Sequence, residues 1–252
     1  MGTRLIAKDI DAEDTAVEYL APVRRGLEAI HFMNKTPEKV AKNYAPGKPN
    51  AVFVGSPVSI GAQSVRTKSL SAYVQTQVRE ARAMTIFSVV RTQDTLADNA
   101  TRPMFYGTFR SLPADGTTAD TTFGISLFAA SATQYSAGAG RGNSLADHTS
   151  GPATLTVAPG SWALMIHRTG VGASEDTIVR NETAGTQAQN ASSALPRYPS
   201  LGLLRIGSGY TQFAGHADMA FFQAHSVALT TDEIATVVAD VRTHMARRGV
   251  TI

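Results

Sequence analysis

The chain has 252 residues, of which 43% are hydrophobic and 17% are charged, and it contains no cysteine. The absence of cysteine excludes a disulfide scaffold, a zinc–thiolate site, an iron–sulfur cluster and a cysteine nucleophile. The net charge is only +3, and the basic residues are spread along the chain. No apolar run approaches the ~20 residues of a membrane-spanning helix. The N-terminus lacks the apolar stretch of a signal peptide. Neither nucleic acid nor a membrane is therefore expected as a partner.

Residues 1–28 are rich in charged side chains and are predicted to form a helix or an extended arm. The segment 11–19 contains good helix formers, and Pro22 limits it on the C-terminal side. The segment is either an ordinary helix packed on the body of the protein or an attachment arm that docks on another subunit. In the second case the contact would use Leu5, Ile6, Tyr19 and Leu20.

Residues 29–229 consist of short apolar or alternating runs separated by Gly, Pro, Asn, Asp and Ser. The runs lie at 51–54, 71–78, 84–91, 104–109, 123–129, 153–157, 162–167, 203–206 and 217–224. Many short strands with turn residues between them predict an all-β fold, an antiparallel β-sandwich or jelly roll. The run 84–90 is largely apolar on both faces, so we expect it to be buried on both sides. Residues 132–151 and 170–199 are predicted to be long loops.

One amphipathic helix is predicted over residues 230–248. Thr230 and Glu233 have the spacing of a capping box, and Gly249 supplies a stop after the last turn. Apolar residues then recur at helical spacing on one face, namely Ile234, Val237, Val238, Val241 and Met245. We therefore expect residues 29–252 to form one sandwich domain with this helix packed on it.

No motif predicts a cofactor or a metal site. The run Gly138, Gly140, Gly142 lacks the spacing of a phosphate-binding loop. His216 and Asp218 would share one face of a strand, but no third ligand can be named. No cofactor is expected.

Catalytic chemistry is also not indicated. A polysaccharide-cleaving enzyme needs two facing carboxylates, whereas Glu175, Asp176 and Glu182 fall in a predicted loop. A Ser/His/Asp triad is assembled in space and leaves no local pattern, so the sequence does not decide on it. The chain is predicted not to be an enzyme.

Aromatic side chains in loops are candidates for stacking on sugars. Tyr135, Tyr198 and Tyr210 lie in such stretches, whereas Tyr106 and Trp162 lie in predicted strands and are more typical of a core. The three loop tyrosines are the predicted glycan contacts.

The C-terminal third resembles the concanavalin A-like, laminin G-like jelly rolls. The resemblance rests on Leu204–Gly207, 213–215, 218–222 and the segment Ala228–Ile234, which reads A-L-T-T-D-E-I. Trp162–Ile166 followed by Ile178–Asn181 is similar to the paired strands that precede these segments in the family. Some members coordinate calcium through loop Asp and Asn residues, but that set finds no match here.

The N-terminal stretches 5–9, 19–23 and 26–28 look like the start of tailed-bacteriophage virion proteins that carry such a domain behind an attachment segment. This resemblance implies a structural role in a tail, a fibre or a capsid decoration, with other virion proteins as partners and synthesis in the host cytoplasm. A homo-oligomer, with a trimer as the expected form, would present the sandwich outward to host-surface glycans. The alternatives are a lectin without a structural role and, third, a polysaccharide-cleaving enzyme.

Overall fold

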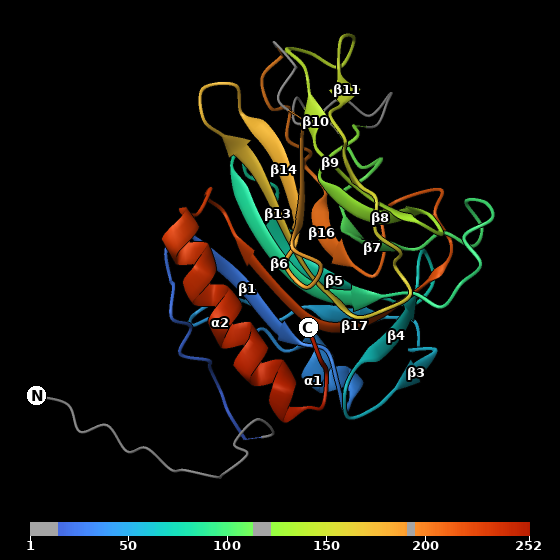
Figure 1. Cartoon of the computed structure of the whole chain (residues 1–252), viewed down its shortest axis with the longest axis vertical. Helices are drawn as coiled ribbons and strands as arrows, with labels where there is room; N and C mark the ends of the chain where they lie inside the picture. Colours follow the sequence, from blue (N-terminus) through green and yellow to red (C-terminus); the bar gives the residue numbers. More distant parts are fainter. Residues whose placement is uncertain (1–14, 113–121, 191–194) are drawn as a thin grey trace, which may run out of the picture.

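The computed structural model describes residues 15–112, 122–190 and 195–252, which form two stacked antiparallel sheets (Figure 1). The eight-stranded sheet contains, in spatial order, β15 (Thr186–Asn190), β14 (Asp176–Asn181), β13 (Ala163–Val171), β6 (Met84–Arg91), β17 (His216–His225), β4 (Val65–Lys68) and β3 (Ser59–Ile60), with β1 (Leu27–Phe32) also paired to β17. The seven-stranded sheet contains β12 (Ala153–Leu155), β9 (Gln134–Gly138), β8 (Ser126–Ser131), β7 (Met104–Gly107), β16 (Leu203–Ile206), β5 (Tyr73–Arg79) and β2 (Val52–Val54). The predicted all-β antiparallel sandwich is confirmed.

The remaining elements are short, apart from one helix. β10 (Gly140–Arg141) pairs with β11 (Thr149–Ser150) at one end of the sandwich, α1 is Pro37–Ala41, and α2 is Thr231–Arg247. Neither helix of the described residues is long and apolar enough to cross a membrane.

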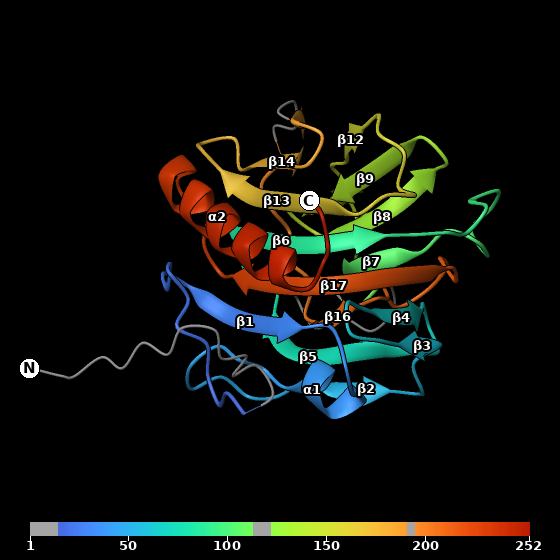
Figure 2. The same ribbon diagram turned by 60° about the horizontal axis from the view of Figure 1, so that its bottom comes forward.

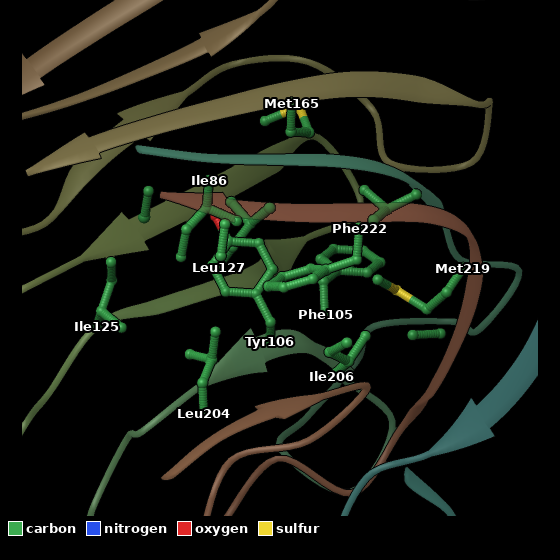
Figure 3. Close-up of a cluster of buried hydrophobic side chains, with 14 of the residues drawn as sticks. Ile86, Phe105, Tyr106, Ile125, Leu127, Met165, Leu204, Ile206, Met219 and Phe222 are labelled. Carbon is green, nitrogen blue, oxygen red and sulfur yellow. The ribbon is translucent and has the colours of Figure 1, made fainter. Parts of the chain in front are cut away.

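The core lies between the two sheets, because successive side chains of a strand point to opposite faces. Aromatic and aliphatic side chains from both sheets meet there, with Phe105 and Tyr106 from β7 packed toward Phe222 from β17 (Figure 3). The Tyr106 and Phe222 rings are 5.6 Å apart and arranged edge to face. One continuous apolar interior therefore joins the sheets.

A second apolar layer covers the other face of the eight-stranded sheet. β6 sends Met84 and Ile86 into the sandwich interior, and it sends Phe87 and Val89 to the outer side. α2 lies across β13, β6 and β17 on that side (Figure 2). The expectation that this strand is buried on both sides is confirmed.

The predicted C-terminal helix is also confirmed. The Thr230 hydroxyl accepts a hydrogen bond from the Glu233 amide, and the Glu233 carboxylate accepts one from the Thr230 amide. The predicted apolar stripe is buried as a whole. Arg25 pairs with Glu233, and this hydrogen-bonded pairing lowers the pKa of the Glu233 carboxyl to about 2.

The two predicted long loops are wrong in part, because they contain strands. β9, β10 and β11 lie within 132–151, and β14 and β15 follow the end of β13 within 170–199. The inward positions of β14 include threonine and asparagine, and β15 is a polar edge strand. Such strands lack the apolar run by which the other strands are recognised.

The predicted boundary between arm and body does not coincide with a structural boundary. β1 starts at Leu27, and Ala21 and Val23 are already buried beneath α2. The Tyr19 hydroxyl donates to the Asp240 carboxylate of α2 at 2.8 Å. From residue 15 to residue 26 the chain forms turns and bends and no helix, so this part belongs to the body.

Two of the four proposed attachment residues can be placed. Tyr19 packs on the protein's own helix, and Leu20 beside it is 65% exposed. Leu5 and Ile6 lie outside the described residues.

Candidate functional site: an aromatic band on the seven-stranded sheet

A row of aromatic rings lies on the outer face of the seven-stranded sheet, on the side away from the eight-stranded sheet and α2. We call this row the aromatic band. Its members are Tyr73, Phe109, Phe123, Phe128, His148, Tyr198, Tyr210 and Phe213, with the guanidinium groups of Arg110 and Arg205 stacked on its rings. Most of these side chains are half-buried.

Phe109 lies at the centre of the band, just after β7. Its ring centroid is 5.6 Å from that of Phe213 and 6.1 Å from that of Phe123. Phe213 in turn packs on Phe128 of β8 at 4.5 Å. Aromatic pairs at these separations attract one another beyond the area that they bury. The loop that follows β16 is thereby held against the sheet.

Arg205 joins Tyr210 and Tyr73 at one end of the band. Its guanidinium carbon lies 3.6 Å from the Tyr210 ring centroid and 4.6 Å from the Tyr73 ring centroid. Arg205 Nε donates to the side-chain oxygen of Gln75 at 2.9 Å. The Tyr210 hydroxyl donates to the Leu203 carbonyl at 2.8 Å. The ring is therefore fixed in position although it is only half-buried.

Tyr198 and His148 form the other end, beside the two-stranded ladder. The His148 ring lies 5.0 Å from Phe123 and 6.4 Å from Tyr198. Arg197 bridges to Arg141 of β10 in extended backbone, where neighbouring side chains point to opposite sides. Because the Arg197 side chain points inward, Tyr198 points to the outer side.

A buried ion pair holds this end from beneath. Both side chains of the Arg197–Glu80 pair are fully buried. The second Glu80 oxygen accepts hydrogen bonds from the Thr108 hydroxyl at 2.7 Å, from the Ile125 amide at 3.2 Å and from the Ser200 amide at 3.1 Å. Both Glu80 oxygens therefore accept hydrogen bonds from the protein itself.

The interior beside this pair is polar. His167 is fully buried and its Nδ1 lies 3.2 Å from the Tyr106 hydroxyl. Burial, together with the nearby positive charge of Arg197, lowers the pKa of His167 to about 3. At the surface a cleft of about 460 Å³ opens between residues 172–175 and 195–196, where Arg82 pairs with Glu175.

The structure places the three predicted glycan contacts differently. Tyr198 and Tyr210 lie at opposite ends of the aromatic band. Tyr135 was assigned to a loop, and this is wrong: it lies in β9, is 0% exposed and packs 5.7 Å from Phe105. Tyr135 therefore faces the core and cannot contact a ligand at the surface.

The sequence does not predict the phenylalanines and His148 of the band as candidate site residues. They come from segments that are far apart in the chain: Phe128 lies within β8, and the others lie in loops outside the strands, without a local motif. The one local signal is the pair Phe109–Arg110, an aromatic residue followed by a cation just after a strand. The fold brings these residues together in space, and no regular spacing in the sequence indicates the site.

The candidate metal pair of the sequence has other partners. His216 Nδ1 lies 3.1 Å from Asp94, and Asp218 pairs with Arg91 at 3.0 Å. Across the described ranges, no group of three or more metal-ligating His, Asp or Glu side chains is found.

No family model and no curated protein matches the sequence. Solved structures do match in fold. The receptor-binding domain of botulinum neurotoxin C/D mosaic serotype is 8% identical, with a TM-score of 0.59 over 87% of this chain and 52% of that one. The binding domain of botulinum neurotoxin DC, solved in complex with SialylT, is 7% identical, with a TM-score of 0.57 over 86% and 52%. Trypanosoma rangeli sialidase, solved with sialic acid, is 12% identical, with a TM-score of 0.54 over 90% and 36%.

These likenesses establish a shared β-sandwich fold and nothing finer. The chain spans about half of the toxin domains and about a third of the sialidase. Their fold agrees with the jelly-roll resemblance in the sequence, whereas the comparisons lend no support to a bacteriophage origin. The virion assignment therefore stays a prediction.

Proposed function

We propose that this chain is a non-catalytic glycan-binding β-sandwich that uses the aromatic band as its contact surface. The observation that carries the proposal is the band itself: half-buried rings held in place by stacking and hydrogen bonds, with polar side chains between them. Ligand sites of proteins combine apolar rings with a few fixed polar groups in this way. Rings already held in place lose little conformational freedom on binding.

Two further observations support this function. Solved structures of the same fold were determined in complex with SialylT and with sialic acid, which shows that such sandwiches occur in proteins that meet sugars. None of the band residues is a carboxylate, and both oxygens of the nearby Glu80 accept hydrogen bonds from the protein itself. A binding role without hydrolysis accords with this side-chain set.

The test is a glycan array on the full chain, followed by calorimetry with the best ligand. We expect Phe123→Ala and Tyr198→Ala to lose about tenfold or more in affinity, because each removes a ring from the contact surface. Trp162→Ala is the matched control, since this ring is also partly buried and stacked on an arginine, Arg91, but lies on the other sheet. Equal losses in all three variants, or no sugar binding by the intact chain, would contradict the proposal.

We also propose, on the sequence resemblance, that the glycan-binding sandwich belongs to a virion and is attached through its N-terminal segment to other virion proteins as a homo-oligomer. The exposed Leu20 side chain, next to a segment that packs on the body, supports a contact at this place. Deleting residues 1–14 and introducing Leu20→Ser in the same chain should abolish incorporation into particles and leave glycan binding intact. Unchanged incorporation, or absence of the chain from purified particles, would refute this part alone.

A further inference from the structure

Arg110 occupies a defined position in the aromatic band. Its backbone amide donates to the Thr122 carbonyl at 2.8 Å, and Ser111 forms a bridge with Thr122. This pairing places Arg110 opposite Phe123. The guanidinium carbon of Arg110 lies 4.6 Å from the Phe123 ring centroid and 5.7 Å from the Phe109 ring centroid.

The Arg110 guanidinium has no hydrogen-bond acceptor among the described residues, and its Nε is buried. Arg205, the other stacked arginine of the band, differs, because it donates to Gln75 and to the Gly209 carbonyl. A buried donor without an acceptor is unfavourable. Stacking on Phe123 holds the cation, and within the described residues its Nε–H stays without an acceptor.

His148 provides a second unpartnered nitrogen against the same Phe123 ring. Its Nδ1 donates to the Leu145 carbonyl at 2.8 Å, whereas its Nε2 is buried and has no partner within the described part of the chain. In the neutral imidazole, donation by Nδ1 leaves Nε2 as an acceptor. Within the described residues the band therefore holds a cationic donor and an acceptor without partners, both packed on Phe123.

The backbone at Arg110 is a third observation. Its φ is +60°, in the left-handed region that glycine adopts without cost. An L-residue with a side chain adopts this conformation at a cost. Strained residues of this kind occur at ligand sites. Glycine would adopt the same conformation without strain.

We infer that the band recognises glycans that carry a carboxylate, with Arg110 as the group that binds it. The planar guanidinium fork matches a carboxylate in a bidentate arrangement. His148 Nε2 accepts a hydrogen bond from a hydroxyl of the same sugar, and the surrounding rings pack on its C–H faces. This inference rests on the proposed glycan-binding function and adds the charge class of the ligand.

The test compares pairs of probes that differ in the acid alone. The first pair is sialyllactose and lactose, and the second is a glucuronic-acid oligosaccharide and the same oligosaccharide with its carboxyl groups reduced to alcohols. Calorimetry on the full chain should show about tenfold or more tighter binding of the acidic member, since a hydrogen bond to a charged group contributes that much. The two pairs also separate sialic from uronic acids as the source of the carboxylate.

Three variants assign the preference to Arg110. Arg110→Gln and Arg110→Gly should lower the affinity for the acidic probe more than that for the neutral probe, so that the ratio of the two affinities approaches one. Arg110→Gly should also leave the melting temperature unchanged or higher, because it relieves the left-handed backbone. Arg24→Gln is the control, since it removes the same charge from an exposed side chain at residue 24, in the N-terminal segment.

The outcomes separate the inference from the proposed function. Neutral and acidic probes that bind equally well to the unaltered chain would overturn the carboxylate inference and leave glycan binding standing. An acid preference that survives both Arg110 variants would assign the carboxylate to another group and would likewise overturn it. Loss of all binding, neutral and acidic, in Arg110→Gln would show a structural role for Arg110 and would also overturn the inference. Absence of all binding would refute the proposed function as well.

Discussion

On both sheets of the sandwich, alternate side chains of each strand point to the outer face. The two outer faces differ in what covers them. On the eight-stranded sheet, Phe87, Val89 and their neighbours are closed over by the apolar stripe of α2. On the seven-stranded sheet, aromatic rings stay half-buried beside arginines. A helix-covered face contributes stability through buried area. A face with fixed and partly wet rings is suited to contacts with another molecule.

The comparison implies that the band depends on buried structure below it more than on its own rings. Tyr198 is aimed outward because Arg197 is held inward by Glu80. On the covered face α2 packs through its apolar stripe, and polar contacts such as Tyr19–Asp240 and Arg25–Glu233 lie beside that stripe. The following substitutions test whether the helix-covered face stabilises the fold while the aromatic band provides a contact surface.

The largest effect is expected from Arg197→Met. The change leaves the Glu80 charge buried and unpaired, which costs about 3–5 kcal/mol in the free energy of unfolding. Urea denaturation measures this loss, and adding Glu80→Gln to the same chain should recover part of it. Arg79→Met is the control, because Arg79 is exposed on β5 and its change should cost about 0.5 kcal/mol or less. Similar losses for the two arginines would show that the pair does not support the band.

A second prediction compares the two faces directly. Met245→Ala removes a fully buried side chain from the stripe of α2 and should cost about 2–5 kcal/mol. Tyr198→Ala removes a larger, half-buried ring from the band and should cost about 1 kcal/mol or less. Both values come from urea denaturation at neutral pH. If the tyrosine variant loses as much stability as the methionine variant, the band is part of the core and not a contact surface.

The elements that the sequence predicts are those whose signal is local. The capping box at Thr230 and Glu233 and the apolar stripe behind it define α2 within one residue of each end. β16 coincides with its predicted run. In both cases neighbouring residues alone determine the pattern, so no tertiary information is needed.

The elements that the sequence misses depend on tertiary contacts. Tyr135 sits among Gln, Ser, Ala and Gly in β9, which resembles a loop until the neighbouring strands β8 and β12 bury it. The aromatic band joins Tyr73 to Phe213 across most of the chain, and no window of sequence contains it. Tyr198 and Tyr210 are predicted glycan contacts because they are aromatic residues in loop-like stretches, whereas Phe123 and Arg110 are brought together by the Ser111–Thr122 bridge.

The smallest effect expected from a single group is a dependence of the free energy of unfolding on pH, caused by histidines buried in the sandwich. Burial lowers the pKa of His31 to about 4, and burial with Arg197 nearby lowers that of His167 to about 3. Unfolding returns each imidazole to an ordinary pKa of about 6.5, so the unfolded chain binds more protons below that pH. Stability is therefore full above about pH 6.5 and falls on acidification, by about 1.4 kcal/mol per pH unit for each histidine.

Urea denaturation at several pH values checks this slope. His167→Gln should remove about a third of the slope between pH 6 and pH 5, because one of three buried imidazoles whose pKa is lowered (His31, His167 and His225) no longer takes up a proton on unfolding. The glutamine amide can still bond with the Tyr106 hydroxyl, so the variant should fold at pH 7. If the slope is unchanged in His167→Gln, protonation of the polar interior does not control acid stability. The acid sensitivity would then arise from groups at the surface. The conclusion that the buried interior and the outer face have separate roles would be contradicted.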